Sequence, residues 1–233
     1  MGSPRSARAP SPHGTWSSAG TSRPSEFHVK HSTRLSNVEL SPSQIDQLQR
    51  YAQLLAAHSE SAGLMAPSDV ERVWERHILD SLRAGCGLPT EGRCADVGSG
   101  AGLPGIPLAM TRPDLRFVLL EPKRRRVAFL ELVIDELRLS NASVHQARVE
   151  ESEAIGPFDV ITARAFAPPA ASWERCRPLL TDEGWLLYFA GAAWKIDTER
   201  GSLANLGPRA EICAGGEFPW QGPVVMMKRA LPA

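Results

Sequence analysis

The chain of 233 residues is long enough for one large domain with an appendage, and its formal net charge at pH 7 is zero. Its hydrophobic content of 42% is ordinary for a globular protein, and no apolar run approaches the ~20 residues that a membrane helix needs. The cysteines have no paired spacing, which predicts neither a metal site nor a disulfide framework and favours a reducing, cytoplasmic compartment. These cysteines are Cys86, Cys94, Cys176 and Cys213.

Residues 1–35 differ from the rest because they are rich in Ser, Pro, Gly and Arg and poor in apolar residues. Five of the 26 basic and one of the 26 acidic residues lie in residues 1–34, which leaves the remainder with a net charge of −4. A segment of this composition cannot bury enough apolar surface to fold, so we expect a disordered basic tail. A transit peptide or an over-long start assignment would give the same composition.

Residues 36–90 predict a helical flank before any strand. A capping box at Ser41 and Gln44 begins the first helix, whose apolar residues fall on one face. A second capping box, which starts at Ser68, begins another helix with apolar residues at helical spacing. We expect this second helix to end at Gly85 as a left-handed cap.

From residue 91 to residue 233, predicted strands alternate with predicted helices. This alternation is typical of a parallel, doubly wound α/β sheet with the first strand near the centre and the ligand at the carboxyl ends of the strands. The helices are expected from Leu103, over Lys123–Leu139 and over Ala170–Leu180. The strands are expected at Arg93–Val97, Arg116–Glu121, Ala142–His145, Phe158–Ala163, Trp185–Phe189, Ala210–Ala214 and Val224–Arg229.

The segment Asp-Val-Gly-Ser-Gly-Ala-Gly-Leu-Pro-Gly, residues 96–105, joins the first strand to an apolar, helix-like run. Its alternating glycines allow a sharp turn and let a ligand lie against bare backbone. The helix that follows offers free N–H groups and the positive end of its dipole. The pattern predicts a nucleotide-like ligand held by Gly98, Gly100 and Gly102.

Two acidic residues indicate which ligand this is. Asp96 lies two residues before Gly98, where it would repel the pyrophosphate of a dinucleotide and attract an ammonium or sulfonium group. Glu121 ends the next strand about 20 residues further on, a spacing that suits a ribose hydroxyl. S-adenosylmethionine satisfies both positions. The alternative is that Asp96 caps the turn and Glu121 is a solvated strand end.

The segment after the fourth strand, Arg164–Pro169, faces the reacting group in a sheet of this kind. It has Ala167 where enzymes that methylate exocyclic amines often place Asn or Asp, and it has no nucleophilic cysteine. Methyl transfer to a ring nitrogen needs neither device and no general base, because no proton leaves. We therefore expect no catalytic side chain. Arg164 is expected to hold a carboxylate or phosphate, unless it forms an ordinary strand-end salt bridge.

Two further groups of polar residues are candidates. His77 and Asp80 lie three apart on the second helix and would face the cofactor, although a hydrogen-bonded core histidine is the more common arrangement. Four consecutive cations begin the helix after the second strand, where they oppose its dipole. They favour RNA phosphate as a partner, with a solvated helix face as the alternative. These cations are Lys123, Arg124, Arg125 and Arg126.

Five segments, when they occur together in this order and spacing, are highly specific for one protein family. They are Arg76-His-Ile-Leu-Asp-Ser81, Asp96-Val-Gly-Ser-Gly-Ala-Gly-Leu-Pro-Gly-Ile-Pro107, Arg124-Arg-Arg-Val-Ala-Phe-Leu130, Arg148-Val-Glu-Glu151 and Arg164-Ala-Phe-Ala167. Through them, residues from about 42 to 229 resemble the bacterial 16S ribosomal RNA guanine-N7 methyltransferases of the RsmG family, also called glucose-inhibited division protein B.

The resemblance implies a class I methyltransferase fold, Rossmann-like, with a seven-stranded, mostly parallel sheet and a final antiparallel strand. It implies S-adenosylmethionine as methyl donor and N7 of a guanine in 16S ribosomal RNA of the small subunit as acceptor. Apart from the resemblance, we expect a monomer without a metal. The guanine would be unpaired, because N7 lies in the deep, narrow groove of A-form RNA. Carried over by position, the cofactor contacts fall on Gly98, Leu103, Val149, Glu150 and Arg164.

The chain departs from the family pattern in two places besides its tail. It has Gly63-Leu64-Met65 where many members have Asn-Leu-Thr, and Ala190-Gly191 where a Lys-Gly pair is usual. Two other hypotheses stay open. A methyltransferase for a small molecule would need no basic surface, and a dinucleotide-binding module without catalysis would have to tolerate Asp96.

Overall fold

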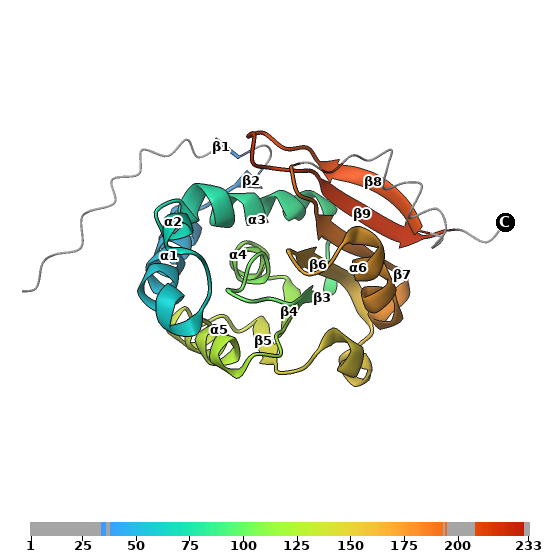
Figure 1. Cartoon of the computed structure of the whole chain (residues 1–233), viewed down its shortest axis with the longest axis horizontal. Helices are drawn as coiled ribbons and strands as arrows, with labels where there is room; N and C mark the ends of the chain where they lie inside the picture. Colours follow the sequence, from blue (N-terminus) through green and yellow to red (C-terminus); the bar gives the residue numbers. More distant parts are fainter. Residues whose placement is uncertain (1–33, 36–37, 193, 195–207, 231–233) are drawn as a thin grey trace, which may run out of the picture. The chain divides into compact units, whose positions relative to one another are not determined.

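The computed structural model describes residues 34–35, 38–192, 194 and 208–230 (Figure 1). These residues belong to one compact unit. The tail expected over residues 1–35 lies outside the described residues except for β1 (Arg34–Leu35), which pairs antiparallel with β2 (Val38–Glu39). No helix in the described part of the chain is long and apolar enough to cross a membrane.

A seven-stranded sheet forms the centre of the described unit, in the order β5-β4-β3-β6-β7-β9-β8. The strands are β3 (Gly92–Val97), β4 (Leu115–Leu120), β5 (Ala142–His145), β6 (Phe158–Arg164), β7 (Leu180–Phe189), β8 (Pro208–Ala214) and β9 (Val224–Arg229). All pairs are parallel except those of β9, which runs antiparallel to both β7 and β8. The doubly wound order, the central first strand and the antiparallel final strand are therefore confirmed.

Helices cover both faces of the sheet because its strands are apolar on both sides. On one face, α1 (Pro42–Ala62), α4 (Gly105–Thr111) and α5 (Arg124–Glu136) share an apolar core with Leu119 of β4. On the other face, α6 (Pro169–Cys176) buries Trp173 against β3 and β6. Figure 1 shows these helices around the strands. The flank expected over residues 36–90 thus shares its core with the sheet.

The first helix begins as its sequence predicts, and the second does not. At α1 the Gln44 N–H donates to Ser41 Oγ at 3.2 Å, and the Ser41 N–H donates to Gln44 Oε1 at 2.9 Å. A capping box at Ser68 is wrong, because α2 (Pro67–Val70) begins one residue earlier. Proline suits the first helical position, since its N–H is absent and its φ is already helical.

The end expected at Gly85 is also wrong. The chain continues from the π-helix η1 (Trp74–Leu79) through α3 (Asp80–Leu82) into the 3-10 helix η2 (Arg83–Gly87). The indole N–H of Trp185 on β7 donates to Gly87 O at 2.7 Å. This tertiary contact satisfies a carbonyl at the end of the helical segment, so a left-handed cap is not needed there.

Three other boundaries shift for local reasons. Helix α4 begins two residues after Leu103, because Ser99 O accepts from the N–H groups of Gly102 and Leu103 and holds the chain in a turn. Helix α5 ends at Glu136, because Arg138 adopts a left-handed φ of 52°. Helix α6 ends at Cys176, and η5 (Arg177–Leu179) follows with Pro178 in its first turn.

The expectation of no disulfide is wrong in this structure. Cys86 of η2 and Cys213 of β8 form a disulfide across a sequence separation of 127 residues, with 6.3 Å between their Cα atoms. The fold places η2 beside β8, and spacing along the chain does not report that proximity. The other cysteines, Cys94 and Cys176, are buried thiols, and burial raises the pKa of each to about 12.

Candidate cofactor and substrate site

The glycine turn after β3 requires glycine at the positions the sequence singled out. Gly98, Gly100 and Gly102 have φ values of 64°, 59° and 89°, in the left-handed region that favours glycine. A Cβ on Gly98 would lie 2.8 Å from the Phe166 ring, and one on Gly102 would lie 2.6 Å from Ile106. The turn therefore combines a left-handed backbone with close packing against the chain's own side chains, which explains why glycine is required at these positions.

The carboxylate of Asp96 lies inside this turn, with 1% of the residue exposed. Its Oδ2 accepts from the Ser99 hydroxyl at 2.6 Å and from the Gly105 N–H at 3.2 Å. Its Oδ1 accepts from the Thr162 hydroxyl at 2.8 Å. Burial raises the pKa of Asp96 to about 6, although these hydrogen bonds lower it. In the structure Asp96 caps the turn, and a contact between Asp96 and a cofactor stays a prediction.

Glu121 follows β4 and joins the second strand to the glycine turn. The residue is 2% exposed, and its Oε2 accepts from the Gly100 N–H at 2.9 Å while its Oε1 accepts from the Lys123 N–H at 2.9 Å. A solvated strand end is therefore wrong for Glu121. The carboxylate keeps further lone pairs, so it can still accept from a ribose hydroxyl beside Gly100.

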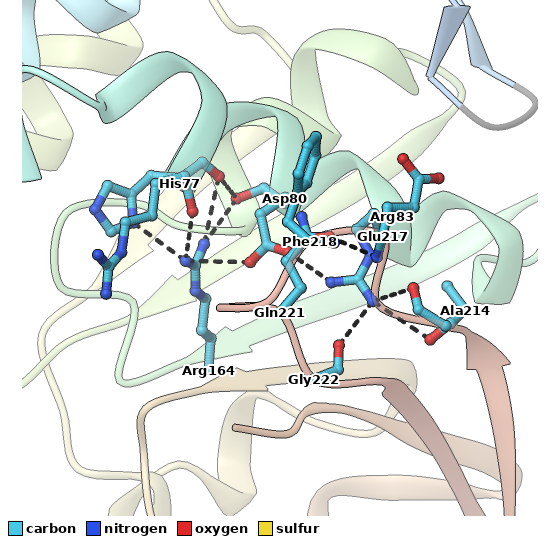
Figure 2. Close-up of polar contacts among 12 residues, drawn as sticks. His77, Asp80, Arg83, Arg164, Ala214, Glu217, Phe218, Gln221 and Gly222 are labelled. Carbon is cyan, nitrogen blue, oxygen red and sulfur yellow. Dashed lines mark hydrogen bonds and ion pairs between the residues drawn. The ribbon is translucent and has the colours of Figure 1, made fainter. Parts of the chain in front are cut away.

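Arg164 at the end of β6 is held by η1 and α3 (Figure 2). Its guanidinium pairs with Asp80 Oδ2 at 3.2 Å and donates to the carbonyls of Arg76 at 3.1 Å and His77 at 3.3 Å. Burial lowers the pKa of Arg164, and the charge of Asp80 raises it. The carboxylate beside Arg164 in this structure belongs to the chain's own Asp80.

His77 is the hydrogen-bonded histidine of this network. A guanidinium can only donate, so the contact of 3.1 Å between Arg164 and His77 Nδ1 makes Nδ1 the acceptor and places the ring proton on Nε2. Burial, followed by the positive charge of Arg164, lowers the pKa of His77 to about 4. His77 is therefore neutral at physiological pH and orients Arg164.

A family model described as GidB, rRNA small subunit methyltransferase G, matches residues 44–205. The chain belongs to this family. Relatives named ribosomal RNA small subunit methyltransferase G include one from Beutenbergia cavernae, 42% identical over 154 residues that cover 66% of this chain and 73% of the relative. Another, from Mycobacterium marinum, is 44% identical over 193 residues that cover 79% of this chain and 84% of the relative.

The fold of this GidB family member is that of the class I S-adenosylmethionine-dependent methyltransferases. A solved structure described as a SAM dependent methyltransferase from Aquifex aeolicus aligns with a TM-score of 0.53 at 14% identity. The alignment covers 70% of this chain and 98% of that chain. At this identity the likeness concerns the fold, and the family membership comes from the sequence.

The remaining candidate residues for cofactor binding lie at the same edge of the sheet. Leu103 follows the glycine turn and is half-buried. Val149, in the 3-10 helix η3 (Val149–Glu151) after β5, is buried, whereas Glu150 is exposed and pairs with Arg175 of α6 at 3.5 Å. The carboxyl ends of β3, β4, β5 and β6 meet at this edge, so the topology brings the candidates together. Their contacts with a cofactor stay predictions.

The basic residues 123–126 fall into two groups in this structure. Lys123, Arg124 and Arg125 are exposed. Arg126 donates to Gly63 O at 3.0 Å and lies 3.9 Å from Glu121 Oε2. Arg126 therefore belongs to the surroundings of the glycine turn, and the other three cations are the ones available to RNA.

Two residues that hold the site together were not among the candidates predicted from the sequence. Arg83 lies with 6% of its side chain exposed and pairs with Asp80 Oδ1 at 2.6 Å. Tyr51 of α1 donates to Ala101 O in the glycine turn at 2.6 Å, and burial raises its pKa well above the ordinary value. The sequence could have indicated Tyr51, because this residue lies on the buried face of α1. Nothing in the sequence distinguishes Arg83 from the other arginines. Among the described residues, no group of three or more His, Cys, Asp and Glu could hold a metal ion.

Proposed function

We propose that this chain transfers the methyl group of S-adenosylmethionine to N7 of a guanine in 16S ribosomal RNA of the small ribosomal subunit. The observation that carries the proposal is the left-handed glycine turn with Glu121 bonded to Gly100, in a chain that belongs to the GidB family. Such a turn accommodates the amino acid and ribose of the cofactor beside the carboxyl ends of the strands.

The residues of the turn fit this cofactor. The left-handed glycines leave bare backbone, and the buried Glu121 carboxylate retains lone pairs for ribose hydroxyls. When bound, S-adenosylmethionine supplies an electrophilic methyl group on a sulfonium. The chain's own residues orient the cofactor against the turn and exclude water on the side of Phe166, whose ring packs over Gly98.

The acceptor side of the site favours a ring nitrogen over an exocyclic amine. The carbonyl of Ala167 accepts from the Ser172 hydroxyl at 2.9 Å and from the Tyr188 hydroxyl at 3.1 Å, so both of its lone pairs are used. It cannot also hold an amine. The N7 lone pair attacks the methyl group directly, and no proton has to leave, so positioning supplies the catalysis and no general base is needed.

The RNA would approach with its target guanine unpaired, because N7 is inaccessible to side chains in an A-form helix. The exposed Lys123, Arg124 and Arg125 offer charge to its phosphates. With this substrate the enzyme would act in the cytoplasm, as a monomer that meets the small subunit.

A methyl-transfer assay tests the proposal. The protein is incubated with labelled S-adenosylmethionine and small subunits from a strain without the enzyme, and the modified base is then identified. We expect label in 7-methylguanine at a single position, none with Gly98→Val, and full activity with Asp135→Asn on an exposed position of α5. Label in another base, or only in a small molecule, would contradict the proposed acceptor.

A further inference from the structure

The connection between β8 and β9, residues 215–223, presents an aromatic surface to solvent. Phe218 is 44% exposed, and its ring stacks on Trp220 with centroids 4.7 Å apart and planes inclined by 3°. The guanidinium carbon of Arg72 lies 4.7 Å from the centroid of the Trp220 ring. Phe218 is thus an exposed ring backed by the half-buried Trp220 and an arginine, which is the kind of surface on which unpaired bases stack.

Strand directions place this connection at the substrate edge of the sheet. Because β9 is antiparallel to both β7 and β8, β8 runs in the same direction as β7 and the other parallel strands. The carboxyl end of β8 and the start of β9 therefore lie at the edge that carries the glycine turn. The Ala190 N–H after β7 donates to Pro223 O at 3.0 Å and ties the connection to that edge.

The aromatic pair sits on a hydrogen-bonded turn. Gln221 Oε1 accepts from the N–H of Glu217 at 2.9 Å and from the N–H of Phe218 at 3.2 Å. The Gln221 N–H donates to Phe218 O at 2.9 Å. A ring that is held in place before a ligand arrives loses little conformational entropy on binding.

The base of the same connection is joined to the methyl-transfer site through Arg83 (Figure 2). Arg83 donates to Gly215 O at 2.5 Å and Gly222 O at 2.8 Å, at the two ends of the turn. It also pairs with Asp80, whose other oxygen pairs with Arg164 at the end of β6. One buried carboxylate thus positions both the strand end that faces the acceptor and the aromatic turn.

We propose that Phe218 and Trp220, flanked by Arg72, form a stacking platform for an unpaired base of the ribosomal RNA substrate near its target guanine. This inference rests on the proposed function. RNA is the occupant that the placement favours, because the acceptor must reach this edge to meet the methyl group. The rings offer flat apolar surface to a base, so we expect stacking to supply the affinity.

Phe218 offers a matched set of variants. Phe218→Leu keeps an apolar side chain and removes the ring, whereas Phe218→Trp keeps a stacking surface. Ile212→Ala removes another large apolar side chain, 50% exposed on the neighbouring β8, and serves as the control. We measure KM for small subunits and for protein-free 16S RNA, the Kd for S-adenosylhomocysteine, and the melting temperature.

Phe218→Leu should raise the KM for both RNA substrates about 10-fold, within the range known for loss of base stacking. This increase should persist as salt is raised. Phe218→Trp should restore KM to within about twofold, and Ile212→Ala should leave it unchanged. The Kd for S-adenosylhomocysteine and the melting temperature should stay at the wild-type values in all three variants.

Equal KM values for wild type and Phe218→Leu would overturn the platform while leaving the proposed function intact. An increase seen with assembled subunits but absent with protein-free RNA would also overturn it, because the turn would then contact a ribosomal protein. A wild-type protein that binds S-adenosylhomocysteine but methylates neither substrate would contradict the proposed function itself, and the platform with it.

Discussion

At the scale of single residues, Asp96 combines full burial with three donors that all favour its ionised form. Burial outweighs these hydrogen bonds, so its pKa in the folded chain is about 6 against an ordinary value of 3.8. Between these values the folded state binds more protons than the unfolded state, and the contribution of Asp96 to stability falls as pH rises. The ionised carboxylate therefore lowers the free energy of unfolding at neutral pH and still holds the turn together.

Asp96→Asn removes this titration. The difference in unfolding free energy between wild type and Asp96→Asn should move by roughly 2 kcal/mol in favour of the variant as pH rises from about 4 to about 7. Denaturant unfolding at several pH values measures it, with the exposed Asp135→Asn as control. A difference that stays constant with pH would show that Asp96 does not titrate in this range.

Gly98 and Gly100 have the same backbone strain but different neighbours. An alanine at Gly100 would meet no atom closer than 3.6 Å, so we expect it to cost only the left-handed strain of about 1–2 kcal/mol. An alanine at Gly98 must also displace the Phe166 ring, and it should lower the melting temperature further and weaken S-adenosylhomocysteine binding. Thermal unfolding and calorimetry compare the two variants, and equal losses would contradict the close contact.

At the scale of elements, the start of α5 presents two exposed arginines and a third, Arg126, that lies near the glycine turn. Reversing both exposed charges, with Arg124→Glu and Arg125→Glu, should raise the KM for RNA and flatten its salt dependence by about two units of slope. The affinity for S-adenosylhomocysteine should not change. Arg126→Gln should weaken the binding of S-adenosylhomocysteine and leave the KM for RNA unchanged, because Arg126 contacts Gly63 and approaches Glu121. RNA methylation that is unaffected at every salt concentration would identify Arg124 and Arg125 as a solvated helix face.

The sequence predicts elements well where a local signal defines them. The capping box at Ser41, the glycine turn and the apolar strands are set by their own residues, and they appear in the structure, although β7 begins at Leu180 instead of Trp185. The second helix was placed wrongly because its end depends on Trp185, about a hundred residues away. The disulfide and the clamp made by Arg83 are likewise properties of the assembled sheet, since each joins η2 to the region of β8.

At the scale of the whole molecule, parallel strands collect distant segments at one edge. The glycine turn, Glu121, Arg164 and the aromatic turn after β8 each follow a strand whose carboxyl end lies there. Asp80 connects the last two through Arg164 and Arg83. The candidate residues for cofactor binding and the proposed RNA platform therefore lie at one edge of the sheet, and the two sets are separate.

This arrangement predicts that cofactor binding stabilises the whole described unit. If S-adenosylhomocysteine binds the folded chain only, then at about 100 times its Kd it should add about 2.7 kcal/mol to the free energy of unfolding. For a chain of this size that corresponds to a rise in melting temperature of about 5–10 °C. NAD should produce no shift, because its pyrophosphate would approach the buried carboxylates of Asp96 and Glu121 at the glycine turn. Thermal melts with each compound make the comparison, and a shift with NAD alone would assign the turn to a dinucleotide and reject the methyl-transfer site.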